Sequence, residues 1–157
     1  MKFVVLTLII CASSFHQVSA QSFDKGAINY RLEEVLPFAK DGNASAQVIL
    51  GAMYMIGQDV PKDVAEGVKW YELAAMQGND TAQYMLGISH LTGLGVLKDD
   101  IKAHVWFNIS AANSNGADNS SAAIRDKLEA HMSRADLSKA RAMARKCMSS
   151  GYSKCGY

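Results

Sequence analysis

The chain lacks the excess of positive charge that nucleic-acid-binding proteins carry. Its 157 residues hold 16 Lys and Arg against 15 Asp and Glu, whereas a domain that binds nucleic acid is usually strongly basic. We therefore expect no nucleic-acid partner. The charge is uneven, because residues 21–124 hold 7 basic and 12 acidic side chains and residues 125–157 hold 8 and 3. The basic end is compatible with an anionic partner or membrane surface, and equally with a solvated helix face.

Metal-binding residues are also scarce. The chain has only three cysteines and four histidines, and a tetrahedral metal site needs three or four ligands at suitable spacing. His90, His104 and His131 show no such spacing with each other or with carboxylates. The sequence therefore predicts no metal ion and no other cofactor.

A set of catalytic motifs is likewise missing. Ser22 and Lys25 have the Ser-x-x-Lys spacing of penicillin-recognising enzymes, but the Ser-Asp-Asn and Lys-Thr-Gly motifs that accompany it are absent. Asp99 and Asp100 are adjacent carboxylates, yet their position before a helical pattern favours helix capping. We expect no catalytic residues, and hence a protein that is not an enzyme.

The one long apolar run lies at the N-terminus, where residues 3–12 follow Met1-Lys2 and precede the small residues Val18-Ser19-Ala20. The run is too short for a membrane span, and its order is that of a cleaved secretory signal. We therefore expect residues 1–20 to be a signal peptide and the mature chain to be secreted or periplasmic, without stable membrane insertion. Cleavage removes Cys11, and the remaining even count in an exported chain predicts a disulfide between Cys147 and Cys155.

What the chain does have is a near-repeat with a period of 36 residues. A fixed period in this range is typical of stacked helix pairs that present binding surfaces. The sequence therefore predicts an all-α fold, an α/α solenoid of stacked antiparallel helix pairs. The recurring residues are Ala46-Gln47, Leu50-Gly51, Gly57, Val60, Asp63, Trp70 and Ala75, matched by Ala82-Gln83, Leu86-Gly87, Gly93, Val96, Asp99, Trp106 and Ala111.

Each repeat predicts two helices joined by a turn that contains glycine. In the first, a helix over 44–56 ends at Gly57, and Asp63 with Glu66 has the capping-box spacing before a second helix that runs to about residue 77. In the second, the helices cover about 81–92 and from Asp99 or Asp100 to about 113. Gly51, and Gly87 at the matching position, lack a side chain, so the partner helix can approach closely.

The flanking segments complete the expected stack. Glu33 to Gly42 aligns with the second helix of a repeat, and Pro37 should kink that helix or mark its start. The expected organisation is a mature domain over 21–157, with a cap at 24–42, repeats at 46–81 and 82–117, a C-terminal helix pair at 121–148 and a tail at 149–157.

These residues carry a family resemblance. The pattern resembles the Sel-1-like repeat, an α/α relative of tetratricopeptide repeats, and the segment Leu36-Pro37-Phe38-Ala39 before Gly42 is similar to the leading cap of bacterial members. The resemblance implies a curved solenoid that serves as an interaction scaffold, here binding a peptide or helix of a cell-envelope partner. Two alternatives stay open, a β-lactam-binding or hydrolysing enzyme like the cysteine-rich relatives, and an inhibitor or regulator of an envelope enzyme. The matching residues are Ala46, Leu50, Gly51, Tyr54, Gly57, Val60, Asp63, Trp70, Tyr71, Ala74, Ala75 and Gly78.

The first helix of each repeat is apolar nearly all round, which demands burial on both sides. Either neighbouring helices cover these positions, or they line an open concave groove for a peptide or helix of a protein partner. The groove candidates are Val48, Ala52 and Met55 in the first repeat and Tyr84, Ile88 and Leu91 in the second.

Overall fold

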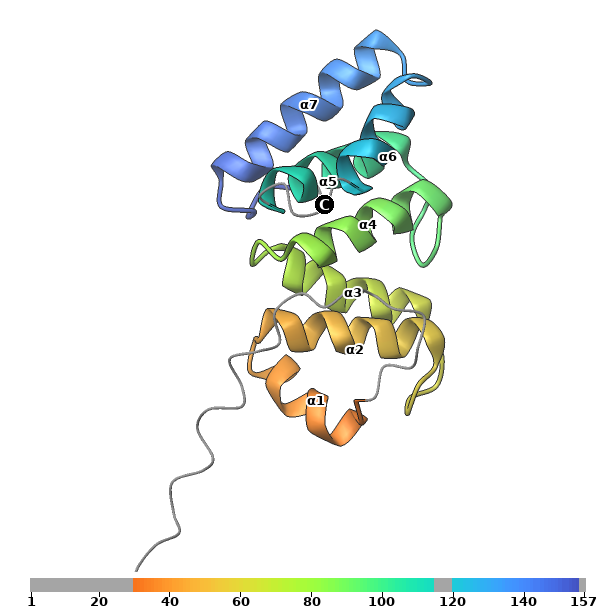
Figure 1. Cartoon of the computed structure of the whole chain (residues 1–157), viewed down its shortest axis with the longest axis vertical. Coiled ribbons are helices and arrows are strands. Elements are labelled where there is room, and N and C mark those ends of the chain that lie inside the picture. Colours follow the sequence, from red (N-terminus) through yellow and green to blue (C-terminus); the bar gives the residue numbers. More distant parts are fainter. Residues whose placement is uncertain (1–29, 115–119, 156–157) are drawn as a thin grey trace, which may run out of the picture.

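A computed structural model describes residues 30–114 and 120–155, which form seven helices and no strand (Figure 1). The prediction of an all-α stack of helix pairs is confirmed for this part of the chain. The expected signal peptide and the first residues of the expected cap lie outside the described residues. The helices are α1 (Leu32–Lys40), α2 (Ala44–Ile56), α3 (Val64–Ala75), α4 (Asp80–Thr92), α5 (Asp100–Asn113), α6 (Ser120–Glu129) and α7 (Arg134–Ser149).

Most helix starts are fixed by a side chain that satisfies a free backbone amide of the first turn. Asp63 accepts from the amide of Glu66 at 3.0 Å, as the spacing predicts, although the Glu66 carboxylate pairs with Lys69 rather than returning to Asp63. Helices α2 and α4 each end at a glycine in the left-handed backbone conformation, which residues with a side chain rarely adopt. The capping residues are Asn43, Asp63, Asn79, Asp99 and Ser133 at the starts, and Gly57 and Gly93 at these two ends.

The turn after α2 departs from the repeat pattern in one residue. Asp59 stands where the second repeat has Gly95, and both adopt positive φ, 56° and 77°. Asp59 makes a contact that a glycine could not make, because its carboxylate accepts a hydrogen bond from the backbone amide of Leu32 at 3.3 Å. Gln58 adds a second bond, from its side-chain amide to the carbonyl of Tyr30 at 2.9 Å. The turn therefore holds the start of α1 against the first repeat.

Close helix contacts hold each hairpin together. A Cβ atom built on Gly51 would lie 2.7 Å from a ring carbon of Tyr71, and one on Gly67 would lie 2.8 Å from the carbonyl oxygen of Gly51. The second hairpin repeats this arrangement with Gly87 against Phe107. Since helix axes can approach this closely only where a side chain is absent, these glycines set the spacing of α2 on α3 and of α4 on α5.

A buried amide ladder joins successive hairpins. The side chain of Gln83 donates to the carbonyl of Ala75 at 3.1 Å and accepts from the side chain of Asn113 at 2.8 Å. Gln47 makes the matching bonds one repeat earlier, to the carbonyl of Ala39 and from Gln77. Each ladder fixes the end of one helix pair to the beginning of the next.

The C-terminal helices depart from the hairpin pattern. Both α6 and α7 pack on α5 rather than on each other, and Figure 1 shows them diverging from their connecting turn. Helix α6 ends at Glu129, and Ser133 starts α7 by accepting the amide of Asp136 at 3.1 Å. At the other end of the stack, Pro37 lies inside α1 rather than at its start.

Candidate functional site

Two of the six predicted groove residues are buried, and the other four are half-buried. Val48 and Ala52 are buried, with 8% and 5% of their surface exposed, and Met55 is half-buried against the same core cluster as Val48. Tyr84, Ile88 and Leu91 are half-buried and pack in a cluster with Phe107 of α5 and with Ile124 and Leu128 of α6.

The physical reason for this burial is that the first helix of each repeat packs between two neighbouring helices. Helix α2 lies between α1 and α3, and α4 lies between α3 and α5, so both faces of each helix are covered. Tyr84 meets Phe107 edge to face with ring centroids 5.8 Å apart. Burial by neighbouring helices accounts for Val48 and Ala52, whereas a groove role for the four half-buried residues stays a prediction.

His90, His104 and both tryptophans occupy packed positions, whereas His131 is exposed. Trp106 is buried and Trp70 is partly buried beside the α1–α2 cluster, which fits their matching repeat positions. Burial also lowers the pKa of His90 below its ordinary value of 6.5. Among the described residues no three His, Cys, Asp or Glu side chains are grouped to hold a metal ion, and no described helix has the length and apolarity to cross a bilayer.

One polar chain connects the three C-terminal helices. His104 of α5 is fully buried, and its Nε2 lies 2.7 Å from Oε1 of Glu129 at the end of α6. The other carboxylate oxygen of Glu129 accepts from Arg141 of α7 at 2.8 Å. The hydrogen bond to His104, with a smaller effect from Arg141, lowers the pKa of Glu129. These three side chains therefore link α6 and α7, which otherwise diverge, to each other and to α5.

Large apolar side chains are exposed along one edge of the stack, at the turns that follow α2 and α4. We call this set the edge residues: Ile56, Leu94 and Leu97, which are 60%, 45% and 89% exposed. Figure 1 shows both turns on the same side of the molecule. The second turn also touches the first turn of α3, because a Cβ on Gly95 would lie 2.7 Å from the carbonyl oxygen of Val64.

The edge residues stand on a fixed backbone. Within the α4–α5 turn the amide of Leu94 donates to the carbonyl of Ser89 at 3.0 Å, and the amide of Asp99 donates to the carbonyl of His90 at 2.9 Å. The ring of His90 also faces the carbonyl of Leu97, with 3.5 Å from Nδ1 to the oxygen. These bonds hold the backbone before and after Leu97, while the side chain of Leu97 stays exposed.

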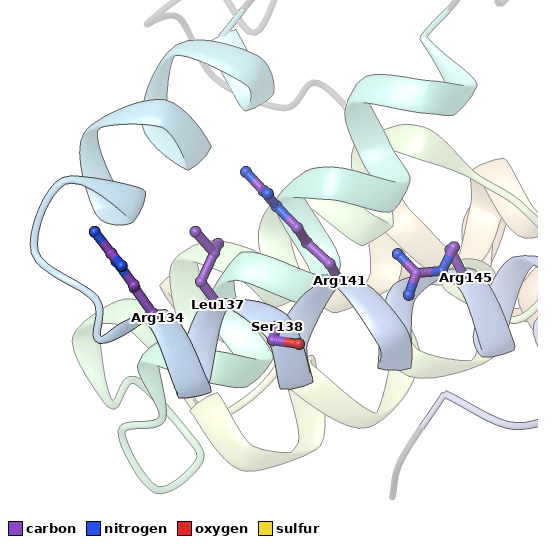
Figure 2. Close-up of a pocket in the computed structure, with 5 residues that line it drawn as sticks. All are labelled: Arg134, Leu137, Ser138, Arg141 and Arg145. Carbon is purple, nitrogen blue, oxygen red and sulfur yellow. The ribbon is translucent and has the colours of Figure 1, made fainter.

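A second surface feature is a hollow of about 310 Å³ on α7, which we call the arginine hollow. Figure 2 shows Arg134, Leu137 and Arg141 extending from the same side of the helix, with Arg145 one turn further along. The described residues that line it are Arg134, Leu137, Ser138, Arg141 and Arg145. The sequence predicts a basic C-terminal end, and the structure places three of its arginines around this hollow on one helix.

The C-terminal tail folds back onto the stack. The structure joins Cys147 of α7 to Cys155 by a disulfide. Between them, the hydroxyl of Tyr152 donates to Oδ1 of Asn113 at 2.9 Å, and its ring lies against Gly78. The tail therefore caps the second amide ladder as well as α7.

The comparisons with known proteins agree with this architecture. A family model described as Sel1 repeat matches residues 44–79 and 80–115. Among solved structures, the chain is similar to c5321, a protective antigen present in uropathogenic Escherichia coli strains and displaying an SLR fold, with 26% identity and a TM-score of 0.70 over 77% of this chain and 26% of that one. It is also similar to a Sel1 repeat protein from Oxalobacter formigenes, with 32% identity and a TM-score of 0.51 over 53% of this chain and 34% of that one.

The chain therefore spans about a quarter and a third of the lengths of these two structures. No curated protein sequence matches it.

Proposed function

Residues 44–115 of this chain are two tandem Sel1 repeats within an all-α solenoid, and from this premise we propose that the protein is a non-catalytic scaffold that binds an apolar segment of another protein. Stacked helix repeats serve mainly as binding surfaces, since their interior is spent on contacts between neighbouring units. In this chain that interior includes most of the first helix of each repeat. A partner would therefore contact exposed residues at the ends of these helices and in the turns that follow them.

The observation that carries the proposal is the exposure of Leu97 on a hydrogen-bonded turn. A leucine that is 89% exposed gains free energy when a partner removes it from water, about 25 cal/mol per Å² of apolar surface. Because the turn is already fixed by its backbone bonds, little conformational entropy opposes that contact. Leu94 lies in the same turn and Ile56 at the end of α2, and both are exposed; we place the contact with the partner on these three residues.

We also propose that the scaffold acts outside the cytoplasm. The apolar run near the N-terminus, with its flanking Lys2 and small residues, supports export. The disulfide between Cys147 and Cys155 is of the kind that persists in oxidising compartments. The partner is accordingly expected among secreted or cell-envelope proteins.

Site-specific photocrosslinking in the native cells tests the proposal. A photoreactive amino acid at Leu97 should give a discrete crosslinked band, whereas the same group at Ala112, which is exposed at the far end of α5, should give none. Leu97→Ser should weaken co-purification of the crosslinked protein, and Ala112→Ser should not. Equal crosslinking from both positions, or none from Leu97, would refute binding at this edge.

A further inference from the structure

The arginine hollow is built from a single face of α7. Arg134, Ser138, Arg141 and Arg145 follow one another at spacings of four, three and four residues, which places them along one helix stripe. Leu137 stands beside this stripe, half-buried, and lines the same hollow. Figure 2 shows the apolar side chain of Leu137 between Arg134 and Arg141, with Arg145 further along the helix.

The three arginines differ in what already binds them. Arg141 donates to the Glu129 carboxylate at 2.8 Å. Arg134 and Arg145 are exposed and have no carboxylate within ion-pair distance among the residues that the structure describes. Two guanidinium groups that bind carboxylates well therefore remain available, one on each side of an arginine that already shows the contact.

We propose that the arginine hollow binds an extended acidic segment of a partner protein, with one carboxylate at Arg134, another at Arg145 and an apolar side chain on Leu137. The spacing supports this ligand. Eleven residues of helix span about 16 Å. In an extended chain only side chains an even number of steps apart share a face, and four steps cover about 13 Å at roughly 3.3 Å per step. The long arginine side chains then have to close only the remaining few Å. The inference rests on the proposed function only in taking the ligand to be a protein, since it concerns a different surface from the edge residues.

A protein segment fits this surface better than an anionic membrane does. A flat layer of headgroups would attract all exposed cations of α7, including Lys139 and Lys146 on the rest of its circumference. Such a layer would not insert a group into the hollow. A side chain of the segment can instead fill the space over Leu137. The test is therefore designed to separate the cations that line the hollow from those that do not.

The experiment titrates the purified protein into a fluorescently labelled peptide, Ac-Glu-Ser-Leu-Ser-Glu-NH2, in which both glutamates and the leucine share one face of the extended chain, and into the same peptide with glutamine in place of both glutamates. The proposal expects the glutamate peptide to bind at least about tenfold more tightly, as for one charge-assisted hydrogen bond. The double variant Arg134→Gln, Arg145→Gln should lose that difference. The charge-matched control Lys139→Gln, Lys146→Gln should keep it within about threefold, because exposed charges off the site act only through screened long-range attraction.

Each alternative result overturns the inference. Equal binding of both peptides, or equal weakening by both double variants, would show only general attraction to positive charge. Binding to phosphatidylglycerol vesicles but not to the peptide would assign the surface to a membrane, and self-association lost in the arginine variant would assign it to a second copy of the chain. Arg134→Lys with Arg145→Lys adds a check, because it keeps the charge and should weaken binding by removing the planar fork. None of these measurements depends on crosslinking at Leu97.

Discussion

Gly87 of α4 lies directly against the ring of Phe107 of α5. A Cβ atom at Gly87 would be 2.7 Å from two ring carbons, and Phe107 is fully buried and cannot turn away. Alanine in place of glycine inside a helix normally stabilises by about 0.5–1 kcal/mol. Here the contact reverses the sign, and we expect Gly87→Ala to destabilise the protein by about 1–3 kcal/mol, as overpacking does.

Chemical denaturation of the wild type and Gly87→Ala measures this difference. The second variant Gly87→Ala with Phe107→Leu is the control, because a smaller side chain at 107 opens room for the added methyl group. The pair should show a positive coupling, with the alanine costing less in the leucine background. An alanine that stabilises the wild type would mean that α4 and α5 do not meet at this point.

The buried ladder gives a second prediction. Gln83 is fully buried and bonded at both ends of its side chain, so Gln83→Leu removes the acceptor of the Asn113 side-chain amide. It also removes one of two donors to the carbonyl of Ala75, which keeps the amide of Gly78 at 3.0 Å. We expect a loss of about 1–3 kcal/mol, the penalty for buried polar groups left unsatisfied. Gln77→Leu, at the exposed end of the preceding ladder, should cost less because water can replace its bonds. Equal costs for the two variants, measured by urea denaturation, would contradict this account.

The lowered pKa of His90 predicts a pH dependence of stability. Since the folded state holds this ring neutral by burial, the unfolded chain binds a proton more readily, and acid favours unfolding. The free energy of unfolding should therefore be highest above pH 6.5, the ordinary pKa, and should fall as the pH drops from there towards the lower pKa of the folded state. Thermal melting between pH 7.5 and 5.5 measures the fall.

The variant His90→Tyr isolates the contribution of this ring. The first repeat has Tyr54 at the matching position, and a tyrosine does not titrate in this range. We expect its melting temperature to change less with pH than that of the wild type. Parallel pH profiles for the two proteins would assign the effect to other groups. The lowered pKa of Glu129 acts in the same direction, but only below its ordinary value of 4.5, outside the range measured.

The local signals in this sequence predict the repeats well. Asp63 and Asp99 start their helices and Gly57 and Gly93 end theirs, because capping depends on neighbours within one turn. Gly51 and Gly87 likewise mark close helix contacts at both matching positions. A period that repeats these signals in the same order is sufficient to predict the stack.

The surface is harder to predict, because it depends on contacts between distant segments. Whether Tyr84, Ile88 and Leu91 face water is decided by α6, which packs with them from about 40 residues further along the chain. The recurrence of Gln47 as Gln83 within otherwise apolar helices does carry a usable signal, because a buried amide at a repeated position implies a repeated hydrogen bond.

The tail supplies the last prediction. The Cys147–Cys155 disulfide closes a short loop, with a sequence separation of 8, and such a loop stabilises by about 2–3 kcal/mol in the chain-entropy account. Cys147→Ser with Cys155→Ser should lower the free energy of unfolding by about that amount. The double serine variant should also be insensitive to dithiothreitol, whereas the wild type should be destabilised by it.

Tyr152→Phe separates the covalent link from the docking that it supports. This variant keeps the disulfide and removes only the bond from the hydroxyl to Asn113, so it should cost about 0.5–1.5 kcal/mol and remain sensitive to dithiothreitol. If the serine variant loses no more than Tyr152→Phe does, the tail is held by its packing on Gly78 and Asn113. In that case the disulfide would contribute no stability beyond these contacts, and the expected entropic effect of the short loop would be wrong.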